Sequence, residues 1–249
     1  MVVAVLAGLV VAPLASEALD WGPSARPLWP AHATCRSCGA QVAWVERLPV
    51  HGWYRRPCAA CGDRRPRREV AVEAATPVAC GLTAWWAGPS WALPAFAYLA
   101  VVAVVLTVID IGEHRLPNRI VLPSYLVGAA LLGVAALATG AWSDLLRAVA
   151  GFGALGGTYF VLAFIHPSGL GFGDVKLAAL LGLYLGWLGW AEVAVGGFLG
   201  FLLGGLVGLV LVATGVAGRK THIPFGPFML LGAATAMVTA DRVAQWYAR

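Results

Sequence analysis

Two aspartates are the residues of this chain best placed to do chemistry. Asp110 follows the apolar run 103–109, and Asp174 follows three glycines in five residues and precedes another apolar run. An ionisable side chain at the end of a membrane span is expensive and usually functional. Plainer interpretations stay open: Asp110 as a helix-end residue that reaches headgroup water, and Asp174 as a helix N-cap after a flexible loop.

The spacing of the two aspartates indicates that they return to one membrane face. They lie 64 positions apart, which accommodates two spans of about 20 residues and their connecting loops. Two nearby carboxylates share one proton and titrate as a unit. The ionised carboxylate can take a proton from water while the protonated one polarises a scissile carbonyl. The pair therefore predicts aspartyl-protease chemistry at a membrane surface.

The segment around Asp174 contains further candidates for substrate contact. Gly171 and Gly173 lack side chains, so the backbone of a bound peptide can come close to them. Lys176 lies two positions after Asp174 and therefore off the same helical face. It is either an anchor at the membrane interface or a charge that tunes the pair.

Four cysteines have the spacing of a metal site. Cys35 and Cys38 form one Cys-x-x-Cys pair, Cys58 and Cys61 form another, and positions 39–57 separate them. This matches the template of two pairs 15–20 residues apart. Four thiolates close a tetrahedral sphere, so the expected site is structural zinc, although iron fits the same ligands. Redox pairs or accidental cysteines are the alternatives. Cys80, in an apolar run, is expected to be a small buried hydrophobe.

The composition requires membrane helices to position these residues. Of 249 residues, 60% are hydrophobic and 12% are charged, and the mean hydropathy is +0.78. Soluble domains carry about 25% charged residues, so we expect an all-α polytopic membrane protein. Eight arginines cluster between positions 36 and 68. They favour a cytoplasmic loop that obeys the positive-inside rule over nucleic-acid binding.

Apolar runs of about 20 residues predict about eight transmembrane helices. The first 20 residues lack the basic region of a secretory signal, so they count as a span. The predicted division is a first transmembrane helix (1–20), a cytoplasmic zinc-binding loop (21–69) and a transmembrane protease core (70–249). The predicted spans are 2–19, 70–88, 91–111, 120–139, 145–165, 175–187, 193–216 and about 225–243.

The basic residues predict the orientation in the membrane. Most of them lie on the same side as segment 21–69, whereas the short turns 88–90, 140–144 and 189–192 contain none. The positive-inside rule then places the N- and C-termini outside, and the zinc loop and both aspartates at the cytoplasmic face.

At this point the sequence resembles the type IV prepilin peptidase family, which are membrane aspartyl proteases with a Gly-x-Gly-Asp motif. The likeness covers most of the chain from Cys35 onward, and the order and spacing of its motifs make it specific. Those motifs are both cysteine pairs, residues 44–49, residues 68–73, Ile109-Asp110 with Leu116-Pro117-Asn118, Gly171-Phe172-Gly173-Asp174-Val175-Lys176-Leu177, and Ile223-Pro224-Phe225-Gly226-Pro227-Phe228.

The resemblance implies an endopeptidase of the bacterial inner membrane. It would remove the short basic leader of type IV prepilins or type II secretion pseudopilin precursors at the cytoplasmic face. Asp110 and Asp174 match the family's catalytic aspartates. Zinc-bearing members often also methylate the new N-terminus with S-adenosylmethionine, so that cofactor is implied as well. Residues 9–19 match the family's first span poorly, and Asn118 stands where the family commonly has aspartate, which leaves Asp110 as the first acid.

Two functions of other classes compete with the protease. In a proton- or cation-coupled transporter, the acids would line an ion path and the zinc loop would regulate it. Against it, both aspartates are predicted at one face. In a non-catalytic scaffold, the zinc loop would bind proteins and both aspartates would be replaceable.

Overall fold

The computed structural model describes residues 2–17, 33–34, 38, 40–42, 58, 60–62, 67–165, 170–215 and 224–247. Within these residues the chain forms eight helices and two short strands, which confirms the predicted all-α fold. The helices are α1 (Val2–Glu17), α3 (Arg67–Ala87), α4 (Leu93–Glu113), α5 (Asn118–Thr139), α6 (Trp142–Ile165), α7 (Phe172–Leu188), α8 (Trp190–Ala213) and α9 (Gly226–Tyr247).

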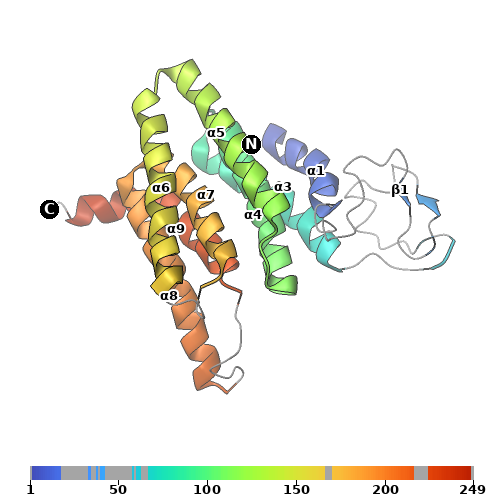
Figure 1. Cartoon of the computed structure of the whole chain (residues 1–249). Coiled ribbons are helices and arrows are strands. Elements are labelled where there is room, and N and C mark those ends of the chain that lie inside the picture. The colour runs from blue at the N-terminus through green and yellow to red at the C-terminus, as the bar shows by residue number, and fades with distance from the viewer. Residues whose placement is uncertain are drawn as a thin grey trace. The chain divides into compact units, whose positions relative to one another are not determined.

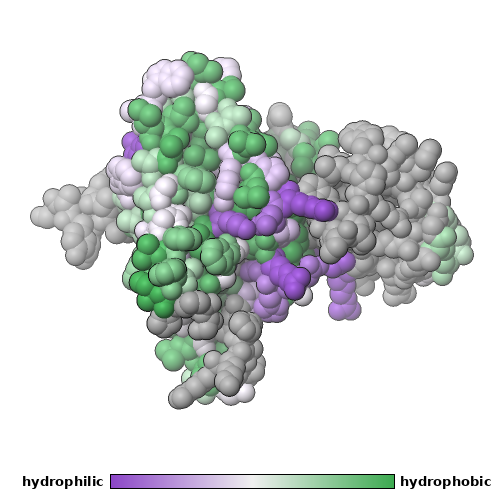
Figure 2. Space-filling view, viewed as in Figure 1, coloured by the Kyte–Doolittle hydropathy of each residue, from purple (hydrophilic) through white to green (hydrophobic). Residues whose placement is uncertain are grey.

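Each predicted span overlaps one of these helices. Among the described residues, α4, α5, α6 and α8 are long and apolar enough to cross a membrane. The crossing of all eight stays a prediction. Large apolar side chains are widely exposed along α5, α6 and α8, as expected for surfaces that face lipid, and Figure 2 shows apolar residues over much of the visible surface.

The chain divides into two compact units. The first comprises residues 1–93 and 97–108, and the second comprises residues 94–96 and 109–249. In the first unit, α1 packs against α3, where Gly8 lies so close to Pro77 that an added Cβ would be 2.8 Å from the Pro77 Cα. The same unit contains an antiparallel pair of strands, β1 (Ala33–Thr34) and β2 (Gln41–Val42).

Helix α7 is the centre of the second unit. It contacts α5, α6, α8 and α9, and residues 177–186 are all buried. This matches its sequence, because a helix that is apolar on every side is a buried helix. Figure 1 shows α5 and α6 as neighbouring antiparallel helices, joined by a tight turn in which Gly140 adopts a φ of 73°.

Helices α6 and α7 pack closely because small residues line their interface. A Cβ on Gly151 would lie 2.5 Å from the Gly182 carbonyl oxygen and 3.0 Å from the Gly186 Cα. Small residues let two membrane helices approach at backbone distance. The close approach fixes α7 along α6, and with it the position of Asp174 in the first turn of α7.

Candidate active site

Asp110 lies in the last turn of α4, as predicted from the end of its apolar run. Its side chain is 5% exposed, and one carboxylate oxygen, Oδ2, accepts a hydrogen bond of 2.9 Å from the backbone N–H of Gly226. Gly226 is the first residue of α9. The first N–H groups of a helix have no partner inside the helix and favour a negative charge. The start of α9 therefore satisfies an acid that would otherwise be costly to bury.

Asp174 lies in the first turn of α7. The helix begins at Phe172, three residues before the start of the predicted span 175–187, and so it includes Gly173. The N-cap is Gly171, not Asp174, and the Asp174 Oδ2 accepts a hydrogen bond of 3.1 Å from the Gly171 N–H. The carboxylate thus folds back over the helix start and compensates for a cap residue without a side chain. Gly169 lies outside the described residues.

The negative charge of Asp110 acts on Asp174. Burial raises the pKa of Asp174 to about 6, the Gly171 N–H opposes that rise, and the negative charge of Asp110 adds to it. Asp174 lies ahead of the predicted crossing 175–187. One proton held between two such groups is the condition for acid–base work by an aspartate pair.

Lys176 is directed to helix α5. Its Nζ donates a hydrogen bond of 2.8 Å to the Asn118 Oδ1, and its backbone carbonyl accepts one of 2.8 Å from the Tyr125 hydroxyl. Both contacts tie the first turns of α7 to α5. Which of the two predicted roles Lys176 has, interfacial anchor or tuning charge, stays open.

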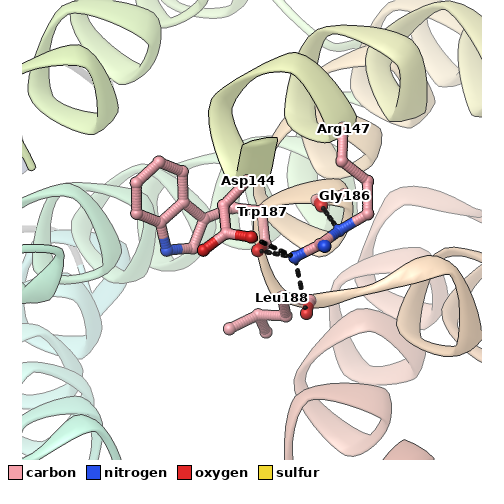
Figure 3. A network of polar contacts seen from close by, with 5 residues as sticks. All are labelled: Asp144, Arg147, Gly186, Trp187 and Leu188. Atoms are coloured by element: carbon pink, nitrogen blue, oxygen red, sulfur yellow. Dashed lines mark hydrogen bonds and ion pairs between the residues drawn. The ribbon is translucent and has the colours of Figure 1, made fainter. Parts of the chain in front are cut away.

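The opposite end of α7 is held by Arg147 of α6 (Figure 3). Its guanidinium donates hydrogen bonds to the carbonyl oxygens of Gly186, Trp187 and Leu188 at 2.8, 2.7 and 3.0 Å, and lies 3.1 Å from Asp144. The last carbonyls of a helix lack partners inside it, and a cation is favourable there. Arg147 therefore caps α7 at the end away from Asp174.

Sequence reasoning did not assign a role to two residues near the aspartates, Gly226 and Leu116. Both belong to motifs that the resemblance includes. The contacts that give them a position, however, join residues far apart in the chain, and no local spacing signals them. Leu116 lies in the turn between α4 and α5, next to both Gly173 and Gly226.

Three of the four predicted metal ligands come together. The sulfur atoms of Cys38, Cys58 and Cys61 all lie within 4.8 Å of one another, and those of Cys38 and Cys58 are 3.8 Å apart. Zn–S bonds of about 2.3 Å in a tetrahedral site place two sulfurs about 3.8 Å apart, so the donors fit a metal ion. Cys35 lies outside the described residues.

The backbone from Cys58 to Gly62 forms a tight turn. Gly62, directly after Cys61, has a φ of 73°, and its N–H donates a hydrogen bond of 2.7 Å to the Cys58 carbonyl. Strands β1 and β2 pair Thr34 with Gln41 on either side of the other cysteine pair. Cys80 is buried in α3, as predicted.

Two family models match the chain. One, described as the type IV leader peptidase family, matches residues 97–218 and so includes both aspartates. The other, described as the bacterial peptidase A24 N-terminal domain, matches residues 6–87 and so includes all four predicted ligands. It also includes residues 9–19, which resemble the family's first span only poorly.

Similar proteins carry the name prepilin leader peptidase/N-methyltransferase. The protein of that name from Stutzerimonas stutzeri is 30% identical over 87% of this chain and 74% of its own length. Those from Aeromonas hydrophila and Pseudomonas aeruginosa are 29% and 28% identical, over 73% and 74% of their own lengths. No solved structure matches the chain significantly.

Proposed function

Because the chain belongs to the type IV leader peptidase family, we propose that it is a membrane endopeptidase that cleaves prepilin-like precursors. Its substrates would be type IV prepilins or pseudopilins, whose short basic leader precedes a hydrophobic helix. The observation that carries the proposal is the pair of acids held at the helix ends: Asp110 on the Gly226 N–H and Asp174 on the Gly171 N–H. The transporter alternative has no support from the relatives, which are named as peptidases.

The proposed reaction uses one proton shared by Asp110 and Asp174. The ionised carboxylate removes a proton from a water molecule, whose oxygen attacks the scissile carbonyl, while the protonated carboxyl donates its proton to the carbonyl oxygen. The resulting tetrahedral species collapses, the C–N bond breaks, and a proton passes to the leaving amine. The pair ends the cycle with one proton, as it began.

The second proposed activity is N-methylation of the new N-terminus with S-adenosylmethionine as donor. It is supported by the double name of the relatives. We assign no described side chain to the methyl donor.

The proposed metal is zinc, with Cys35 as the fourth ligand beside Cys38, Cys58 and Cys61. A site closed by four thiolates would stabilise the fold of its loop and leave no position for water. It would therefore act in structure and not in hydrolysis.

The proposed location is the bacterial inner membrane, with several crossings and with the zinc loop and the aspartates on the cytoplasmic side. The distribution of Lys and Arg supports this orientation. The family resemblance implies a substrate whose basic leader is removed at this cytoplasmic face.

Co-expression with a prepilin tests the proposal. Wild-type protein should reduce the precursor mass by that of the leader, and Asp110→Asn and Asp174→Asn should leave the precursor intact. The matched control is Asp144→Asn, which removes an acid in the first turn of α6, at the end away from Asp174. This variant should cleave the precursor normally. Cleavage by both active-site variants would refute the aspartate mechanism. An intact precursor beside well-inserted wild-type protein would refute the peptidase.

A further inference from the structure

Leu116 packs against the backbone that carries Asp174. A Cβ placed on Gly173 would lie 3.1 Å from the Leu116 Cβ, 3.4 Å from its Cδ1 and 3.6 Å from its Cγ. These are contact distances or closer, so the leucine side chain lies flat over Gly173. The first turn of α7 cannot move toward Leu116 without displacing it.

The far end of the same side chain reaches the backbone that holds Asp110. A Cβ on Gly226 would lie 3.5 Å from the Leu116 Cδ2 and 2.8 Å from the Asp110 Oδ2. Gly226 donates the hydrogen bond that fixes Asp110. The Leu116 side chain therefore lies between two backbone positions: Gly173, next to Asp174, and Gly226, which binds Asp110.

The turn that carries Leu116 is constrained at both ends. His114, directly after α4, has a φ of 52°, and its N–H donates a hydrogen bond of 2.9 Å to the Asp110 carbonyl. Pro117 is the N-cap of α5 and restricts Leu116, which precedes it, to extended conformations. A half-buried side chain on so short a turn has little freedom to swing aside.

We propose that Leu116 is a positioning residue: a spacer that sets the separation of the Asp110 and Asp174 carboxyl groups. The inference rests on the proposed function, because it concerns the pair that would perform cleavage. Leu116 itself has no group that reacts. Its role would be to set how far apart the backbone segments that carry the two acids are held.

The spacer makes opposite predictions for two substitutions. Leu116→Ala removes the side-chain atoms between Gly173 and Gly226. The two backbone segments then pack closer, and the two carboxyl groups move toward each other. Their repulsion grows, and the shared proton is held to higher pH. Gly173→Ala adds a methyl group against Leu116, which pushes α7 away from Asp110, and the proton is then lost at lower pH.

The size of the effect follows from Coulomb's law. For any two unit charges roughly 5 Å apart at an effective dielectric constant of about 20, a change of 1 Å in their separation alters a pKa by roughly 0.4. The same displacement reduces kcat by about tenfold or more, because the reacting groups are misplaced.

The experiment measures protonation without requiring turnover. The purified full-length protein is treated over a pH series with a carbodiimide, which modifies protonated carboxyl groups, and labelling at Asp110 and Asp174 is located by mass spectrometry. Cleavage of a prepilin gives kcat and KM for the same samples. We expect labelling midpoints to move up for Leu116→Ala and down for Gly173→Ala. The value of kcat should fall in both variants, and KM should be nearly unchanged for Leu116→Ala.

Controls separate the spacer from general loss of packing. Leu131→Ala removes a half-buried leucine of α5, and Gly133→Ala adds a methyl group where nothing lies within 4 Å. Neither should move the midpoint. Leu116→Met, which conserves volume, should keep the wild-type midpoint. His114 acts electrostatically on Asp110, Tyr159 and Asp174 act on each other in the same way, and Lys176 donates a hydrogen bond to Asn118. All three residues are kept in every variant.

The outcomes distinguish the two hypotheses. Opposite shifts support the spacer, whether or not the protein cleaves a prepilin, whereas no shift or shifts of one sign overturn it. Leu116→Val is the milder replacement if Leu116→Ala inserts poorly, and it should shift the midpoint in the same direction. Absence of cleavage by wild-type protein would overturn the proposed function alone.

Discussion

Asp110 and Asp174 are supported in the same way although they lie on different helices. In each, one carboxylate oxygen accepts a hydrogen bond from a glycine N–H at the start of a helix. The donor to Asp110 is Gly226, the first residue of α9, and the donor to Asp174 is Gly171, the N-cap of α7. A backbone donor at such a position favours the charged carboxylate, whereas burial and the neighbouring acid favour the protonated one. In the proposed mechanism, the balance of these effects sets the pH range in which the pair holds one proton.

The raised pKa of Asp174 predicts a pH dependence. Burial and the charge of Asp110 favour the protonated form, so the pair keeps its shared proton until pH rises through about 6. At lower pH the second carboxylate also binds a proton. We therefore expect a bell-shaped profile of kcat/KM whose alkaline side has a midpoint near 6. Thermal unfolding over the same pH range checks that the protein stays folded. A rate that keeps rising through pH 8 would contradict this assignment.

The cysteine cluster predicts metal in the purified protein. We expect about one zinc ion per chain by elemental mass spectrometry, and a clear loss of zinc in Cys58→Ala, because a four-thiolate site does not tolerate the loss of a ligand. Cys80→Ala is the matched control, since Cys80 is buried in α3 and should leave the metal content unchanged. Equal zinc in both variants would exclude this site, and iron in its place would correct the identity of the metal.

At the scale of elements, α7 is held at both ends and along its length. Asp174 and Gly171 close its first turn, Arg147 caps its last carbonyls, and the glycines facing α6 allow contact at backbone distance. Because these contacts are made by backbone atoms, a change of side-chain rotamer cannot relieve them. The helix that carries one half of the acid pair is therefore fixed by its neighbours.

Two alanine substitutions in α6 test this packing. Gly151→Ala places a methyl group 2.5 Å from the Gly182 carbonyl oxygen and should destabilise the protein by about 1–3 kcal/mol, because backbone atoms must move apart. Gly153→Ala, on the same helix, meets nothing within 4 Å and should be neutral or stabilising by up to about 1 kcal/mol. Denaturation in detergent micelles measures both. Equal stability of the two variants would contradict the close α6–α7 contact.

At the scale of the whole molecule, the charge pattern predicts the side on which each turn lies. In intact spheroplasts, a membrane-impermeant maleimide should label Ser90→Cys, in the turn before α4. It should label Arg115→Cys, in the turn after α4, only after permeabilisation. Both positions are exposed. Wild-type protein measures the background labelling of the native cysteines. Labelling of Arg115→Cys in intact spheroplasts would place the candidate active site on the outer face.

The sequence predicted the helices well because long apolar runs identify membrane helices almost by themselves. It placed Asp110 and Asp174 at helix ends because each marks the boundary of such a run. It did not predict that Gly226 would bind Asp110, since the two are separated by 116 positions, or that Leu116 would touch Gly173. An apolar pattern identifies which residues of a helix are buried, but it does not identify the residues of other helices that they contact. The start of α7 was placed too late for a related reason: the Asp174 side chain itself closes the first turn around Gly173.

The most direct test of the central claim, that Asp110 and Asp174 act as one unit, is the cleavage rate of purified Asp110→Asn, Asp174→Asn and the double variant. Groups that share one proton lose their function together, so each single substitution should abolish cleavage and the double variant should be no slower than either. Partial losses whose free energies add in the double variant would contradict the account.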